Sequence, residues 1–131
     1  MNRKNLHARV EKAKAAMLFA KVLHYDSDGR VISILLPGTQ GKNYHVIIRR
    51  RPASVELNLE TAMGFVKPYY AHHYITYHAM AAMMVAAREQ GYKIQWCASG
   101  EDARRLSNID GIPFRITNHD NPEIKMWGVY L

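Results

Sequence analysis

The chain has 131 residues, of which 48% are hydrophobic and 22% are charged. These proportions are ordinary for a globular chain, so they exclude wholesale disorder and predict one domain over residues 1–131. No apolar run approaches about 18 residues, so no membrane-spanning helix is expected, and the N-terminal stretch lacks the apolar region of a secretory signal. Cys97 is the only cysteine, which excludes an intramolecular disulfide and predicts a reducing, cytoplasmic location.

The net charge is +7 at pH 7 and the isoelectric point lies near 9.7. A basic balance of this size favours a polyanionic partner, either a nucleic acid or an anionic surface. Many small basic proteins carry such a charge only for solubility, so the charge leaves both interpretations open.

Residues 4–24 are predicted to form the first helix, because apolar residues recur at spacings of three and four. This apolar row consists of Leu6, Val10, Ala13, Met17 and Ala20, and Leu18 and Val22 widen it. The N-terminal part of the helix is basic, which opposes the helix dipole and suggests cations reserved for phosphate: Arg3, Lys4, Arg9, Lys12 and Lys14. A solvated helix face is the more frequent reason for such a row.

Three strands are predicted next, over residues 31–36, 43–50 and 54–60, each bounded by turn residues. In the third, Val55, Leu57 and Leu59 point one way while Ser54, Glu56, Asn58 and Glu60 point the other. The sequence therefore predicts a three-stranded antiparallel meander with one face against the helices.

The second of these strands carries the most concentrated positive charge in the chain. Three successive arginines end it, and they cannot all be buried because an unpaired guanidinium in the interior costs several kcal/mol. Basic and aromatic side chains together suit phosphate contact and base stacking, and those of this strand and its two ends are Lys42, Tyr44, His45, Arg49, Arg50 and Arg51. The competing interpretation is a sheet edge that charge protects against aggregation.

Residues 67–91 are predicted to form one long, buried central helix, with Pro68 in its first turn and Gly91 just past its end. Its second half, residues 79–87, is almost wholly Ala, Met and Val. An apolar circumference of this kind is packed on most sides, and self-association through this helix is a second hypothesis.

The remainder predicts a strand over residues 92–97, a short helix over 101–108 capped by Ser99, and strands over 113–117 and 125–131. The order is α-βββ-α-β-α-ββ, which indicates one α+β domain.

Enzymatic chemistry finds little support in the residue pattern. His78 follows His73 by five positions and His72 by six, whereas helical metal ligands converge at three or four. Cys97 ends a strand just before a helix, where a thiolate would be favoured, but a lone cysteine is more often a small buried hydrophobe. We therefore expect no catalytic residues, no metal and no cofactor.

The strand SVELNLE followed by TYHAMAAMMVAAREQGYKIQWCASGEDARRL resembles small SWIM-type zinc-finger proteins in outline. The resemblance covers roughly residues 31–108 and places His78 at the family's histidine ligand. Thr76, Val55 and Leu57 stand where the other three ligands would be. The resemblance thus implies a relative without zinc, in a family associated with DNA and protein binding.

These observations lead to a hypothesis of a small, non-enzymatic nucleic-acid-binding protein, compatible with a phage, viral or plasmid accessory role. Its partner would be DNA or RNA, held by the basic strand and by the cations of the first helix. The alternative is a protein-interaction or homo-oligomeric assembly subunit that uses the central helix. A third hypothesis, an enzyme that uses Cys97, requires Cys97→Ser to abolish a defined activity.

Overall fold

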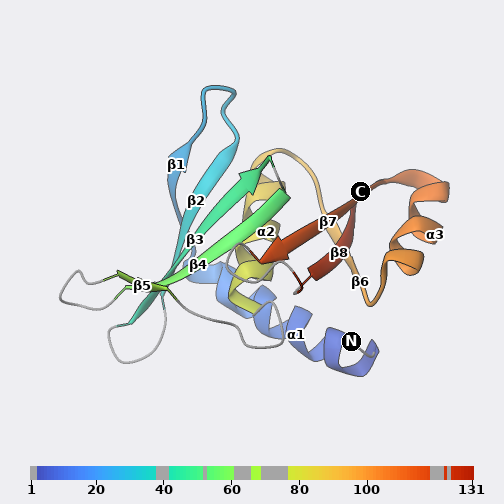
Figure 1. Ribbon diagram of the computed structural model, residues 1–131, viewed down its shortest axis with the longest axis horizontal. Coiled ribbons are helices and arrows are strands. Elements are labelled where there is room, and N and C mark those ends of the chain that lie inside the picture. The colour runs from blue at the N-terminus through green and yellow to red at the C-terminus, as the bar shows by residue number, and fades with distance from the viewer. Residues whose placement is uncertain are drawn as a thin grey trace.

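The computed structural model describes residues 3–37, 42–51, 53–60, 66–68, 77–118, 123 and 125–131. It is a mixed α+β structure in which helices pack on both faces of one sheet (Figure 1). The elements are α1 (Arg3–Ala16), the 3₁₀ turn η1 (Met17–Phe19), β1 (Lys21–Tyr25), β2 (Val31–Pro37), β3 (Asn43–Arg50), β4 (Ala53–Glu60), β5 (Val66–Pro68), α2 (Tyr77–Glu89), β6 (Ile94–Cys97), α3 (Gly100–Asp110), β7 (Ile112–Asn118) and β8 (Lys125–Tyr130).

The sheet has eight strands, and seven of them follow the order β1-β2-β3-β4-β7-β8-β6. All neighbours are antiparallel except β4 and β7, which run parallel where Ser54 pairs with Thr117. β5 pairs with β4 outside this order, opposite residues 58–60. The predicted three-stranded meander, which is β2-β3-β4, is therefore only the middle of a wider sheet.

α2 lies on one face of the sheet, against β2 and β3, and α1 packs beside it (Figure 1). Ala81 and Ala82 are fully buried, and Met84 is the most accessible residue between His78 and Ala87. Small alanine side chains allow the helix to approach the sheet closely. The apolar circumference of α2 is thus covered by β2, β3 and α1 of the same chain, without a second copy.

α3 packs on the opposite face, at the end of the sheet formed by β6, β8 and β7 (Figure 1). There Ala103 joins Cys97 and Val129 in a small apolar cluster, apart from the main core. Ser99 caps α3 as predicted, because its Oγ accepts the Asp102 N–H at 3.2 Å. On the same side of the sheet, no described helix covers β1 to β4.

The predicted first helix over residues 4–24 is wrong in its second half. The α-helix ends at Ala16, and residues 21–25 form β1, which pairs with β2. The apolar row from Leu6 to Ala20 does pack against the core, but Leu18 is 78% exposed. Val22, Leu23 and Tyr25 suit a strand as well as a helix, and pairing with β2 decides between them.

The predicted central helix is too long at its N-terminal side. Pro68 is the last residue of β5 and pairs opposite Asn58, while α2 is described only from Tyr77. Lys67 and Pro68 therefore belong to a strand paired with β4 and not to the first turn of a helix. The predicted positions 69–76 lie outside the described residues.

The predicted end of α2 is confirmed. Gly91 has φ of 81°, a conformation that favours glycine, and it allows the Tyr92 N–H to reach back to the Ala87 carbonyl at 2.9 Å. The predicted strands over residues 92–97, 113–117 and 125–131 appear as β6, β7 and β8. Within the described ranges, no helix combines the length and apolarity required to cross a membrane.

Candidate nucleic-acid interface

The register of β1 to β4 determines which side chains face away from the helices. Val46, Ile48, Val55 and Leu57 are buried in the core with α2, so the alternating positions point to the other side. Facing pairs are Leu35–His45–Asn58 and Ser33–Ile47–Glu56 across β2, β3 and β4. We call this surface the open face; its described side chains are Lys21, His24, Ser33, Leu35, His45, Ile47, Arg49, Ser54, Glu56 and Asn58.

Two histidines on the open face are held by one serine. His24 Nδ1 lies 3.1 Å from Ser33 Oγ, and His45 Nε2 lies 2.9 Å from the same oxygen. A hydroxyl group has one proton to donate and two lone pairs, so it can bond to both rings at once. Ser33 is only 4% exposed, whereas His24 is exposed and His45 half-buried. The buried hydroxyl therefore orients two imidazole rings near the surface of the sheet.

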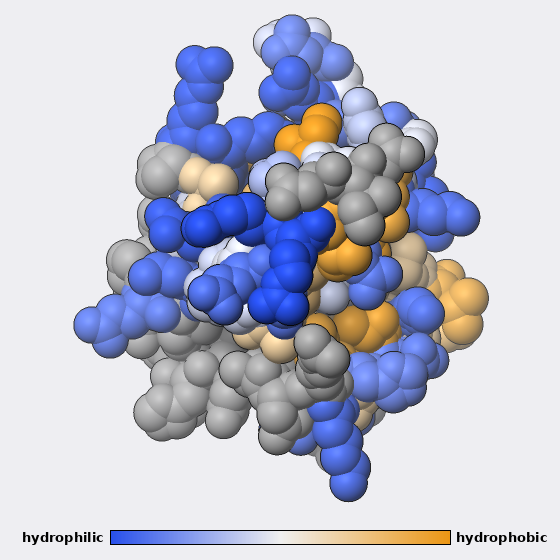
Figure 2. Space-filling view, turned by 90° about the vertical axis from the view of Figure 1, so that its right-hand side faces the viewer, coloured by the Kyte–Doolittle hydropathy of each residue, from blue (hydrophilic) through white to orange (hydrophobic). Residues whose placement is uncertain are grey.

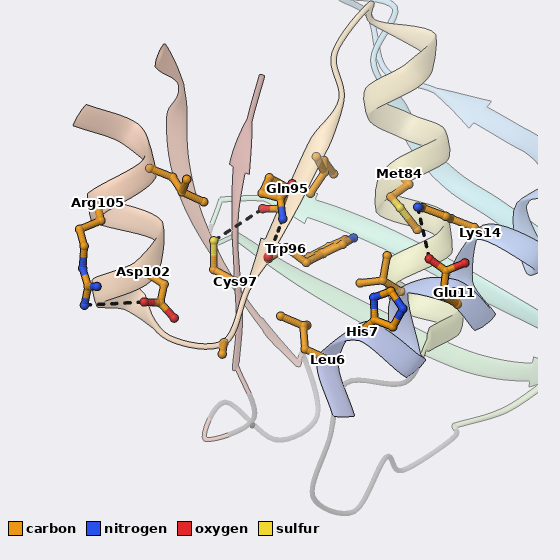
Figure 3. A pocket seen from close by; sticks show the side chains of 14 residues that line it. Leu6, His7, Glu11, Lys14, Met84, Gln95, Trp96, Cys97, Asp102 and Arg105 are labelled. Atoms are coloured by element: carbon orange, nitrogen blue, oxygen red, sulfur yellow. Dashed lines mark hydrogen bonds and ion pairs between the residues drawn. The ribbon is translucent and has the colours of Figure 1, made fainter. Parts of the chain in front are cut away.

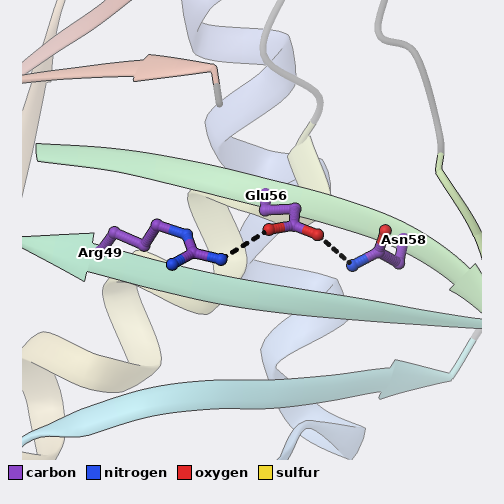
Figure 4. A network of polar contacts seen from close by, with 3 residues as sticks. All are labelled: Arg49, Glu56 and Asn58. Carbon is purple, nitrogen blue, oxygen red and sulfur yellow. Dashed lines mark hydrogen bonds and ion pairs between the residues drawn. The ribbon is translucent and has the colours of Figure 1, made fainter. Parts of the chain in front are cut away.

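A second polar network lies on β3 and β4 (Figure 4). Arg49 Nη2 donates to Glu56 Oε2 at 3.1 Å, and Asn58 Nδ2 donates to Glu56 Oε1 at 3.2 Å. The Arg49 side chain remains 47% exposed, so the ion pair itself contributes at most about 1 kcal/mol to stability. Its main effect is to hold the guanidinium along the open face, with part of it accessible to solvent.

The same side of the sheet continues onto β7 and β8. Thr117 pairs with Ser54, so its side chain lies on the side of the open face. Lys125 lies on the same side because it pairs with Thr117, and Arg115 does so because it lies two residues before Thr117 in the same strand. With Lys21 and Arg49, four cationic side chains thus lie on one side of the sheet. Glu56 is the only carboxylate among the described side chains of the open face.

The basic strand that the sequence singles out divides between the two sides of the sheet. His45 and Arg49 lie on the open face, and the exposed Lys42 and Arg51 lie beyond the two ends of β3. Tyr44 and Arg50 point to the other side, toward the helices: Tyr44 stacks on the His78 ring with centroids 3.8 Å apart, and Arg50 Nη1 donates to the Val31 carbonyl at 3.0 Å.

The cations of α1 lie on the helical side, away from the open face. Lys14 Nζ is 3.5 Å from Glu11 Oε1, and Lys12 Nζ lies 6.0 Å from the centre of the Tyr77 ring. Lys4 is exposed and Arg9 half-buried, while the side chain of Arg3 is not described. The structure therefore does not unite these cations with the open face.

Four residues on this side of the sheet were not predicted from the sequence: Lys21, His24, Arg115 and Lys125. The sequence predicts a helix at Lys21 and His24, where they would not share a surface with His45. The sequence feature that indicates a strand here is the β-branched and aromatic content of residues 21–25. The place of Arg115 and Lys125 beside β4 depends on the parallel β4–β7 pairing, which no local pattern indicates.

His78 and Cys97, the sequence's candidates for metal binding and catalysis, are both buried. Burial lowers the pKa of His78 to about 4, so its imidazole is neutral at pH 7. Burial, together with the negative charge of Asp102, raises the pKa of the Cys97 thiol, which donates to the Gln95 carbonyl at 3.7 Å. The structure thus gives Cys97 the character of a packed thiol, because thiolate formation is disfavoured there.

Three of the four residues that carry the SWIM resemblance, Val55, Leu57 and His78, belong to the core, and the fourth, Thr76, lies outside the described residues. Val55 and Leu57 are at most 2% exposed, and His78 lies between the rings of Tyr44 and Tyr77. Among the described residues, no group of three His, Cys, Asp or Glu side chains is placed to hold a metal ion. Comparisons with protein-family models, with curated proteins and with solved structures match no family, no protein and no structure.

Proposed function

We propose that this protein binds single-stranded nucleic acid on the open face. The observation that carries the proposal is an antiparallel surface of four strands, β1 to β4, with helices behind it and two serine-oriented histidines on it. Sheets with this arrangement bind single strands by stacking two or three bases on rings that project from the strands. The four strands span about 14 Å, which suits a few nucleotides.

The binding mode follows from the chemistry of the side chains. Lys21, Arg49, Arg115 and Lys125 contact phosphate groups, while His24 and His45 offer ring faces to the bases. A single strand suits this surface better than a duplex because its base faces are free to stack. Asn58, which is 6% exposed, holds Glu56 in place and so keeps Arg49 extended along the strands.

Fluorescence anisotropy tests this proposal, with labelled single-stranded DNA and RNA 12-mers and the matching duplexes at several salt concentrations. Four phosphate contacts give a log–log salt slope of about −2.8 for a single strand, because each contact contributes about 0.7. The Lys21→Ala and Arg49→Ala variants are each expected to weaken binding and to reduce the slope by about 0.7.

The matched control is Lys14→Ala, because Lys14 is also an exposed, ion-paired cation but lies on α1. It is expected to leave both affinity and slope unchanged. Absence of binding at low salt refutes the function, and an equal loss from Lys14→Ala removes the open face as the site.

A further inference from the structure

The last strand of the sheet, β6, has one edge that no described strand covers. Lys93 and Leu131 exchange two backbone hydrogen bonds, of 3.2 and 2.9 Å. In an antiparallel pair such residues alternate with ones whose N–H and C=O groups point away. Because Gln95 and Cys97 follow Lys93 at even spacing, Ile94 and Trp96 are the residues that turn their backbone groups outward.

The two edges of the sheet differ in how they are protected. At the β1 edge the register is broken at two places and Lys21 is present, and both features discourage strand addition. β6 pairs with β8 in unbroken register and reads Ile-Gln-Trp-Cys, with no charge and no proline. A side chain of β6 itself reaches this edge only weakly, because Gln95 Nε2 lies 3.5 Å from the Trp96 carbonyl oxygen.

A groove of about 580 Å³ runs along this edge, and we call it the β6 groove. Leu6 and Val10 of α1 and Met84 of α2 line one side, and Leu106 of α3 lines the other. Figure 3 shows residues of β6 between α1 and α3. Figure 2, which views the α3 side of the molecule, shows hydrophobic side chains gathered between charged ones.

The charges around the β6 groove are paired within the chain. Lys14 lies 3.5 Å from Glu11, and Arg105 lies 3.7 Å from Asp102. The groove therefore offers no strong net charge to a ligand, but it offers apolar side chains and the outward backbone groups of Ile94 and Trp96. These features match an uncharged, extended peptide rather than a nucleic acid.

We propose that the β6 groove binds an extended, largely uncharged peptide segment of a protein partner as an additional strand beside β6. Its backbone bonds to the N–H and C=O groups of Ile94 and Trp96, and alternate apolar side chains contact Leu6, Val10 and Met84. α1 and α3 both contact β6, so a single strand fits between them better than a second folded copy with its own helices.

The test selects peptides from a displayed library of random heptapeptides on the intact protein. The expected consensus alternates apolar residues with uncharged polar ones. Ile94→Pro removes one outward N–H without removing a bond to β8, and it is expected to weaken binding of the consensus peptide about tenfold, the effect of one hydrogen bond. Tyr92→Ser, an exposed position outside the groove, serves as the control and keeps full affinity.

Amide hydrogen exchange supplies the second readout. Bound peptide is expected to slow exchange at Ile94 and Trp96 and to leave Gln95 and Cys97, already bonded to β8, unchanged. Should Ile94→Pro fail to fold, Val10→Ser takes its place, with the same expected loss of affinity. The proposal is overturned if the variant enriches the consensus peptide as well as the unsubstituted protein does. It is also overturned if bound peptide does not slow amide exchange at Ile94 and Trp96, or if that exchange slows on dimer formation without peptide.

Discussion

The buried histidine His78 gives the protein a specific response to acid. Its ring lies 3.8 Å from that of Tyr44 and 4.0 Å from that of Tyr77, measured between centroids. The residue is only 8% exposed, and its Nδ1 atom has no hydrogen-bond partner among the described residues. Protonation would place a charge on a largely buried ring whose Nδ1 atom has no described acceptor, so the folded protein stabilises the charged form poorly.

The magnitude follows from the two pKa values. His78 titrates near 6.5 in the unfolded chain and near 4 in the folded protein. Between these values the unfolded chain takes up a proton that the folded protein does not, so stability falls as the pH falls. The full stability is present above about pH 6.5 and the loss is nearly complete at pH 4, where it reaches about 3 kcal/mol.

Urea unfolding between pH 7.5 and 4 measures this loss, with His78→Phe as the reference protein. Phenylalanine keeps an aromatic ring between Tyr44 and Tyr77 but cannot be protonated, and all other histidines are common to both proteins. The unfolding free energy of the unsubstituted protein is expected to fall by about 3 kcal/mol more than that of the variant. Parallel pH dependence of the two proteins would refute the burial argument.

Two further predictions concern packing at the β6–β8 end of the sheet. Gly128→Ala places a methyl group 2.5 Å from Phe114 Cζ, so the free energy of unfolding in urea is expected to fall by about 1–3 kcal/mol. Adding Phe114→Leu to the same chain should relieve part of this loss, and losses that simply add would contradict the clash. Cys97 should react with an aromatic disulfide reagent at pH 7 far more slowly than the same thiol in denaturant, because its pKa is raised by burial; reaction at the rate of the unfolded chain would show that the thiol is accessible.

Local sequence signals were sufficient where only one structure suits them. Strict alternation over residues 54–60 predicted both β4 and the direction of its side chains, because period two separates the faces of a strand. Ser99 and Gly91 predicted helix ends for an equally local reason, since a cap involves backbone groups only a few residues away. These features depend on neighbours in the chain and are visible in the residues.

The open face was predicted only in part. His45 and Arg49 were identified from their strand, but Tyr44 and Arg50 were grouped with them although adjacent strand residues point to opposite sides. Tyr44 stacks on His78, which is distant in sequence. Arg50 likewise donates to the carbonyl group of a distant residue, Val31. Only the tertiary structure decides which side of the sheet the helices cover, and this side separates Tyr44 from His45 and Arg50 from Arg49.

The order of residues was enough to establish the α+β class, the meander of β2 to β4, the helix ends at Ser99 and Gly91, and the core positions of α1. Three features came from the folded chain alone: residues 21–25 form a strand, β7 lies parallel to β4, and none of the described helices covers one face of β1 to β4. The physical reason is that strand pairing joins residues distant in sequence. A segment that suits helix and strand equally takes its structure from the partner it meets.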